Sequence, residues 1–139
     1  MEIFQSLRDR HPDEVVFHIN LGVAYKRIGL LEEAIGSYQK AILLEGGHPE
    51  AYYNLAILFR EQGEFQKAKE AYHQALELDP QFKEAHYNLA ILYDLYLSEP
   101  QTAMLHYQKY LDLGGDRPEE VRIWMAALRK RLEPQQETP

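Results

Sequence analysis

The feature that most constrains the fold of this chain is a repeat with a period of 34 residues. Leu21, Leu55 and Leu89 are successive copies of one position, and a small residue follows each of them. The best local match joins residues 51–59 to residues 85–93. A period in this range indicates a solenoid, in which each copy buries its apolar face against its neighbours.

Within each copy, the apolar residues have the spacing of two helices. In the second copy, Tyr52, Leu55 and Phe59 lie at i, i+3 and i+7, which is one stripe of a helix. Gly63 interrupts the first stripe, and a second stripe ends before Pro80, because proline cannot continue a helix. Each copy is therefore predicted to form two helices joined by a short turn.

The pattern Leu-small-x-x-aromatic, then Gly, then Ala-x-x-x-Tyr-x-x-Ala and Pro, resembles the tetratricopeptide repeat (TPR) family. The resemblance implies an all-α, right-handed superhelical solenoid of antiparallel helix pairs. Three full repeats are expected, with an N-terminal half repeat and a C-terminal capping helix. The third copy contains one extra residue, and Leu97 stands where the turn glycine would be, so we expect a longer turn there.

The repeat pattern also predicts the boundaries of the parts. The expected parts are the second helix of a partial repeat (1–12), three repeats (13–48, 49–82 and 83–117), a capping helix (118–133) and a disordered tail (134–139).

Composition excludes several classes of chemistry. The chain has no cysteine, which removes disulfides, catalytic thiols and Cys-ligated metals. The six histidines have no metal-binding spacing, and no phosphate-binding glycine loop or GxSxG motif occurs. We therefore expect no catalytic residue, no metal and no cofactor, so the chain is predicted not to be an enzyme.

Charge and hydropathy bear on the partners. The net charge of -7 argues against non-specific binding to nucleic acid or to anionic lipid. No apolar run approaches the ~18 residues that span a bilayer. The partner is thus expected to be a protein, with no nucleic acid and no membrane insertion. The expected compartment is the cytoplasm, or the periplasm if a signal sequence has been removed.

The recurring asparagines are the sharpest candidates for a binding site. In the family, the first helices of successive repeats line a concave face, which here would carry Asn20, Asn54 and Asn88. Asparagine is a mediocre helix former, and its amide offers both a donor and an acceptor. We hypothesise a ladder that holds the backbone of an extended peptide. The alternative is that these amides form hydrogen bonds within the stack.

Other side chains of the first helices would flank this ladder and contact the peptide. Apolar or aromatic residues would receive hydrophobic anchors, unless the next helix covers them, and two cations would favour an acidic ligand residue. These candidate residues are Ile19, Tyr53, Tyr87, Val23, Ile57, Ile91, Lys26 and Arg60.

One type of ligand is disfavoured by the same resemblance. Chaperone-binding members of the family hold a terminal carboxylate with a clamp of basic residues and asparagine. The matching positions here include Ile19, Val23 and Glu84, so the clamp is absent. We expect tails similar to Glu-Glu-Val-Asp not to bind.

The predicted function is a non-enzymatic interaction module or scaffold, which binds an extended peptide segment in its concave groove. One alternative is self-assembly into a homo-oligomer through an exposed N-terminal face that includes Phe4 and Leu7. Another is a TPR segment that targets a larger protein or enzyme.

Overall fold

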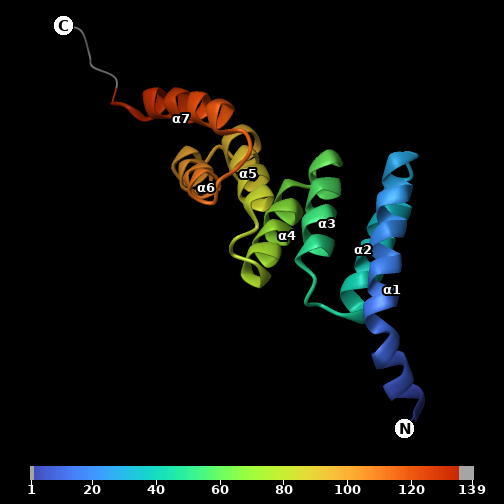
Figure 1. The fold of residues 1–139 in the computed structure, drawn as a ribbon. Coiled ribbons are helices and arrows are strands. Elements are labelled where there is room, and N and C mark those ends of the chain that lie inside the picture. Colours follow the sequence, from blue (N-terminus) through green and yellow to red (C-terminus); the bar gives the residue numbers. More distant parts are fainter. Residues whose placement is uncertain (1, 135–139) are drawn as a thin grey trace, which may run out of the picture. The chain divides into compact units, whose positions relative to one another are not determined.

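The computed structural model describes the backbone of residues 2–134 and the side chains of residues 14–134. The tail from residue 135 and the side chains of Phe4 and Leu7 lie outside the described residues. The described backbone consists of helices joined by short turns and loops, so the expected all-α fold is confirmed (Figure 1). The elements are α1 (Glu2–Arg27), α2 (Leu31–Leu44), α3 (Pro49–Glu61), α4 (Phe65–Leu78), α5 (Lys83–Ile91), the π-helical turn η1 (Leu92–Tyr96), α6 (Pro100–Asp112) and α7 (Pro118–Leu132).

The chain divides into two compact units. In the first unit, Met1–Pro80, α1 packs against α2, α3 against α4, and α2 against α3. In the second unit, Gln81–Pro139, α5 packs against α6, and α6 against α7. The helix pairs α1/α2, α3/α4 and α5/α6 are the three predicted repeats, and α7 is the predicted capping helix. The right-handed superhelix stays a prediction.

The expected helix end at residue 12 is not present in the backbone. Helix α1 continues without a break from Glu2 to Arg27, through Pro12. Proline inside a helix removes one backbone donor and crowds the carbonyl four residues back, at a cost of ~3 kcal/mol, but here the helix continues past it. The segment predicted to be the second helix of a partial repeat and the first helix of the first full repeat are therefore one helix.

The extra residue of the third repeat lies in a helix. The N–H of Leu97 donates to the carbonyl of Leu92 over 3.0 Å, five residues back, which defines the π-helical turn η1. The loop 97–99 has the same length as the loop 62–64 in the second repeat. Our expectation of a longer turn was wrong, because one widened helical turn absorbs the insertion.

The turn itself keeps the geometry of the other repeats. The N–H of Glu99 donates to the carbonyl of Tyr93 (2.9 Å), as that of Glu64 does to the carbonyl of Phe59 (2.8 Å). Ser98 has a φ of 53°, in the left-handed region where the other repeats place glycine. The bond that closes the turn is thus conserved in structure although the turn glycine is missing.

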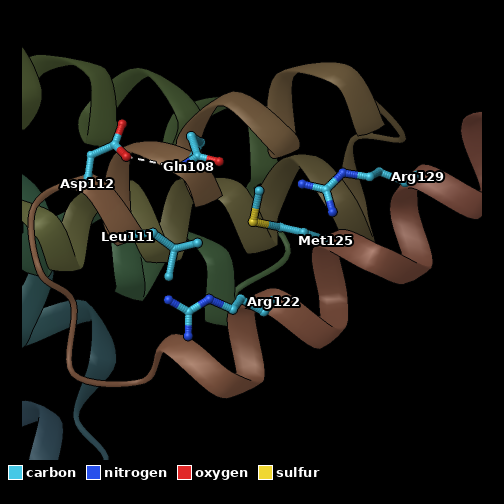
Figure 2. Close-up of a pocket in the computed structure, with 6 residues that line it drawn as sticks. All are labelled: Gln108, Leu111, Asp112, Arg122, Met125 and Arg129. Atoms are coloured by element: carbon cyan, nitrogen blue, oxygen red, sulfur yellow. Dashed lines mark hydrogen bonds between the residues drawn. The ribbon is translucent and has the colours of Figure 1, made fainter.

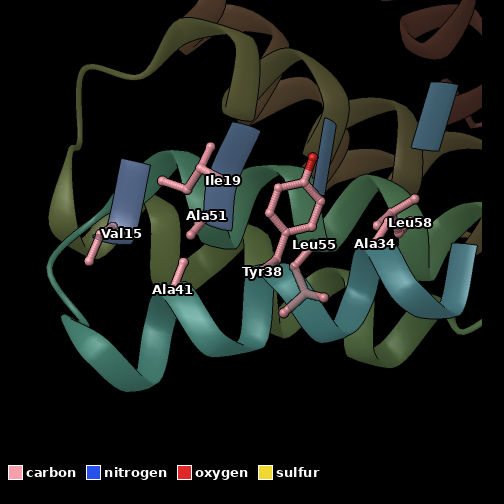
Figure 3. Close-up of a cluster of buried hydrophobic side chains, with 8 residues drawn as sticks. All are labelled: Val15, Ile19, Ala34, Tyr38, Ala41, Ala51, Leu55 and Leu58. Atoms are coloured by element: carbon pink, nitrogen blue, oxygen red, sulfur yellow. The ribbon is translucent and has the colours of Figure 1, made fainter. Parts of the chain in front are cut away.

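The core of the first unit joins α1, α2 and α3. The Tyr38 ring packs directly on the backbone at Gly22, where an added Cβ would lie 2.7 Å from Cε1 and Cζ of the ring. Leu58 is fully buried, and cutting such a leucine to alanine costs ~2–5 kcal/mol. The residues of this core are Val15, Ile19, Ala34, Tyr38, Ala41, Ala51, Leu55 and Leu58 (Figure 3).

The core of the second unit fixes α7 on the helices before it. Val121, Met125 and Leu128 form the buried stripe of α7. The ring of Trp124 lies 5.9 Å from the ring of Tyr107 in α6. This burial is what a capping helix provides at the end of a stack.

Candidate functional site: the face of the first helices

The three asparagines differ in what surrounds them. Asn20 in α1 is exposed, and Asn54 in α3 is half-buried. Neither amide forms a hydrogen bond within the described part of the chain. The Asn88 amide in α5, by contrast, donates from Nδ2 to the carbonyl of Glu84 over 3.0 Å. Local bonding of this kind is the alternative that the sequence left open, and it applies to Asn88.

The apolar candidates are more buried than a binding surface requires. Ile19 is only 7% exposed and belongs to the core of the first unit. Val23, one turn later, is partly buried against the same core. Ile57 and Ile91 are half-buried. Since Ile19 and Val23 face the neighbouring helices, they support the fold and offer little area to a ligand.

The two aromatic candidates have different surroundings. Tyr53 is half-buried, and its ring lies 6.1 Å from the ring of Tyr72 in α4. The Tyr87 ring lies 5.0 Å from that of Tyr110 and 5.9 Å from that of Trp124. The guanidinium of Arg117 stands 5.9 Å over the Tyr87 ring. Tyr87 is therefore part of the packing of α7.

The two cations lie near the ends of their helices. Lys26 Nζ is 3.5 Å from Glu61 Oε1, which joins α1 to α3. Both side chains are about one-third exposed, so this ion pair contributes little to stability. Arg60 lies near Tyr72, whose pKa its charge lowers, although burial raises that pKa more strongly.

In the third repeat, an acidic residue with a structural role occupies the position of these cations. Asp94 is 11% exposed, and its Oδ1 pairs with Nη1 of Arg131 at 3.2 Å. Its other oxygen accepts a hydrogen bond from Tyr107. Asp94 therefore ties η1 to α6 and α7.

The histidines of the second unit stack on one another. His86 is 7% exposed, and its Nδ1 lies 3.0 Å from Nδ1 of His106. The His106 ring also stacks on Tyr93, with centroids 5.8 Å apart. Among the residues whose side chains are described, no three His, Cys, Asp or Glu converge on one point.

Sequence reasoning missed a hollow of about 440 Å³ between α6 and α7 (Figure 2). The sequence signal that could have indicated it is the helical spacing of its lining residues, which is i, i+3 and i+4 on α6 and i, i+3 and i+7 on α7. The lining residues are Gln108, Leu111, Asp112, Arg122, Met125 and Arg129.

Within residues 2–134, every helix is too short or too polar to cross a lipid bilayer.

The helix pairs and their sequence period define a helical repeat protein. Two family models, each described as tetratricopeptide repeat, match residues 18–50 and 49–82. The chain is a tetratricopeptide repeat protein, as the sequence predicted. Comparison with curated proteins gave no significant match.

Several solved structures share the fold. The first TPR of Spaghetti (RPAP3) bound to the HSP90 peptide SRMEEVD is 19% identical, with a TM-score of 0.78 over 86% of this chain and 96% of that one. MamA is 27% identical, with a TM-score of 0.75 over 92% of this chain and 74% of that one. The Yersinia enterocolitica chaperone SycD with a peptide of the translocator YopD is 17% identical, with a TM-score of 0.79 over 87% and 96% of the chains.

Proposed function

We propose that this chain is a non-enzymatic interaction module that binds an extended peptide segment of a partner protein along its first helices. The observation that carries the proposal is the pair Asn20 and Asn54. They occupy one repeat position on α1 and α3, and the fold uses neither amide. Asparagine is a mediocre helix former, so its recurrence here, with amides that the fold does not use, supports a role in binding.

The chemistry of these amides fits a peptide backbone. Each offers a donor and an acceptor, which match the carbonyl and N–H of one peptide unit. Tyr53 and Ile57 on α3 are partly exposed and would contact ligand side chains. Lys26 and Arg60 would favour an acidic ligand residue near the helix ends. In the second unit, the amide of Asn88 is already bonded to the carbonyl of Glu84.

Peptide binding by structural neighbours supports this choice of ligand. Both the Spaghetti TPR and SycD hold peptides in their solved structures. The ligand of this chain should differ from the HSP90 peptide, because Ile19 and Val23 stand where the family clamp requires polar groups. These aliphatic side chains, one buried and one partly buried, cannot bind a terminal carboxylate.

Asn54→Ala is the direct test. The wild type is used to capture the partner from an extract, and mass spectrometry identifies that partner. Titration should then show that the variant binds the partner about tenfold more weakly, a loss of ~1.4 kcal/mol. The melting temperature should hardly change. Gln74→Ala, an exposed amide on α4, is the matched control and should bind as the wild type does. Undiminished binding by Asn54→Ala would contradict the proposal.

Self-association through α1 is a second candidate. Val16 and Phe17 are 50% and 58% exposed, so α1 presents two neighbouring apolar side chains that a second copy could cover. If this face pairs two copies, light scattering should show a dimer that Phe17→Ser converts to a monomer. A wild-type monomer at the highest soluble concentration would exclude this candidate.

A further inference from the structure

The hollow between α6 and α7 is a groove between two matched stripes (Figure 2). On α7, Arg122, Met125 and Arg129 lie at i, i+3 and i+7 and so share one face. On α6, Gln108 and Leu111 contribute the opposite wall. The volume of about 440 Å³ suits one or two ligand side chains.

Two arginines mark the ends of this groove. They lie two helical turns apart, ~10 Å along the axis of α7, and both side chains extend toward α6 (Figure 2). Arg122 pairs only with Glu119, one turn earlier, with side chains 61% and 87% exposed. Arg129 forms no ion pair within the described part of the chain. Exposed pairs of this kind contribute little, so both charges remain open to a ligand.

Two other cations of this region have structural partners. Arg131 pairs with Asp94 at 3.2 Å, and Arg117 lies over the Tyr87 ring. Arg122 and Arg129 have no structural contact of this kind, yet they flank a hollow in a chain whose net charge is -7. The lining of the hollow holds two guanidinium groups against one carboxylate, beside an apolar floor, and this favours an anionic ligand.

We propose that this groove binds an acidic peptide segment, with carboxylates held by Arg122 and Arg129 and an apolar side chain placed on Leu111, above the buried Met125. A guanidinium matches the two oxygens of a carboxylate in a bidentate pair. Asp112 at the rim, whose Oδ1 accepts a hydrogen bond from Gln108 Nε2 at 2.9 Å, opposes a dianion such as phosphate more than a single carboxylate. Because α6 and α7 form this groove, it is a second site that does not depend on the face of the first helices.

The test uses a fluorescein-labelled peptide, Leu-Glu-Leu-Glu-Leu with blocked ends, and the full chain. Fluorescence anisotropy at low salt should show binding by the wild type. Arg122→Gln and Arg129→Gln should each weaken it about tenfold. Asp112→Asn should tighten it severalfold, because it removes a repulsive charge from the rim. Circular dichroism melting should show that all variants are folded.

Lys130→Gln is the matched control, because Lys130 is an exposed neighbour on α7 that does not line the groove. It removes the same charge and should change binding less than about twofold. A loss as large as that of Arg129→Gln would show attraction by net charge alone and overturn the proposal. Equal binding of the peptide with glutamine in place of glutamate, or no binding by the wild type at about 1 mM, would also overturn it.

Discussion

The hydroxyl of Tyr107 donates a hydrogen bond to Oδ2 of Asp94 over 3.2 Å and thereby joins α6 to the π-helical turn η1. Tyr72 is the equivalent residue of the second repeat, but its hydroxyl is buried without a partner in the described structure. The difference arises because the position of Asp94 is Arg60 in the second repeat. The tyrosine hydroxyl at this repeat position is therefore hydrogen-bonded in the third repeat and unsatisfied in the second.

Removal of the two hydroxyls should have different effects. Tyr107→Phe leaves Asp94 without one of its partners, so the free energy of unfolding should fall by about 1–2 kcal/mol. Tyr72→Phe removes an unsatisfied polar group, so it should be neutral or slightly stabilising. Urea denaturation of both variants measures this contrast. Equal losses in the two would show that the bond to Asp94 contributes nothing.

Gly22→Ala should destabilise the first unit. The new Cβ would lie 2.7 Å from the Tyr38 ring, which is itself packed in the core. Overpacking of this kind costs ~1–3 kcal/mol and outweighs the helix propensity gained, which is ~1 kcal/mol. Thermal unfolding should show a lower melting temperature.

Gly36→Ala is the control for that substitution. Gly36 lies within α2, and a Cβ added there meets no atom within 4 Å. Only the propensity gain remains, so this variant should be more stable than the wild type by ~0.5–1 kcal/mol. A stabilised Gly22→Ala variant would mean that the Tyr38 ring moves away at little cost.

Ser98→Gly should stabilise the second unit. Ser98 has a φ of 53°, and a left-handed residue with a Cβ costs ~1 kcal/mol that glycine avoids. The reverse substitution, Gly63→Ala at a φ of 79°, should destabilise the first unit. Chemical denaturation of each variant tests the pair. A destabilised Ser98→Gly variant would show that the serine side chain has another role in the turn.

Stability should decrease at alkaline pH. Burial raises the pKa of Tyr38 to about 12, and it also raises the pKa of Tyr72 and Tyr107. The folded state then holds these protons more tightly than the unfolded state does. The contribution is complete below the ordinary tyrosine pKa of about 10 and is lost as the pH rises toward 12, by ~1.4 kcal/mol per unit for each such tyrosine.

Urea midpoints measured from pH 8 to about 12, with phenolate absorbance, will show this loss. Tyr38→Phe should flatten the curve, since it removes one of the groups that titrate. An unchanged midpoint up to about pH 11.5 would contradict the assignment.

The sequence alone determined the helical repeat and its helix pairs. Leu21, Leu55 and Leu89 mark equivalent positions of the three repeats, and Gly63 falls in the loop where α3 gives way to α4. These features are local, because helical spacing and turn chemistry act within one repeat. The capping helix was predictable for the same reason, from the apolar stripe after Pro118.

Only the tertiary structure decided where the extra residue of the third repeat lies and which side chains remain available. The spacing of Ile19 and Tyr87 matches that of a groove residue, yet Ile19 is in the core and Tyr87 packs against Trp124. The hollow beside Arg122 and Arg129 likewise arises from two helices that meet. Burial and pairing depend on neighbours that are distant in sequence, and a periodic pattern specifies which face of a helix is apolar but not what covers it.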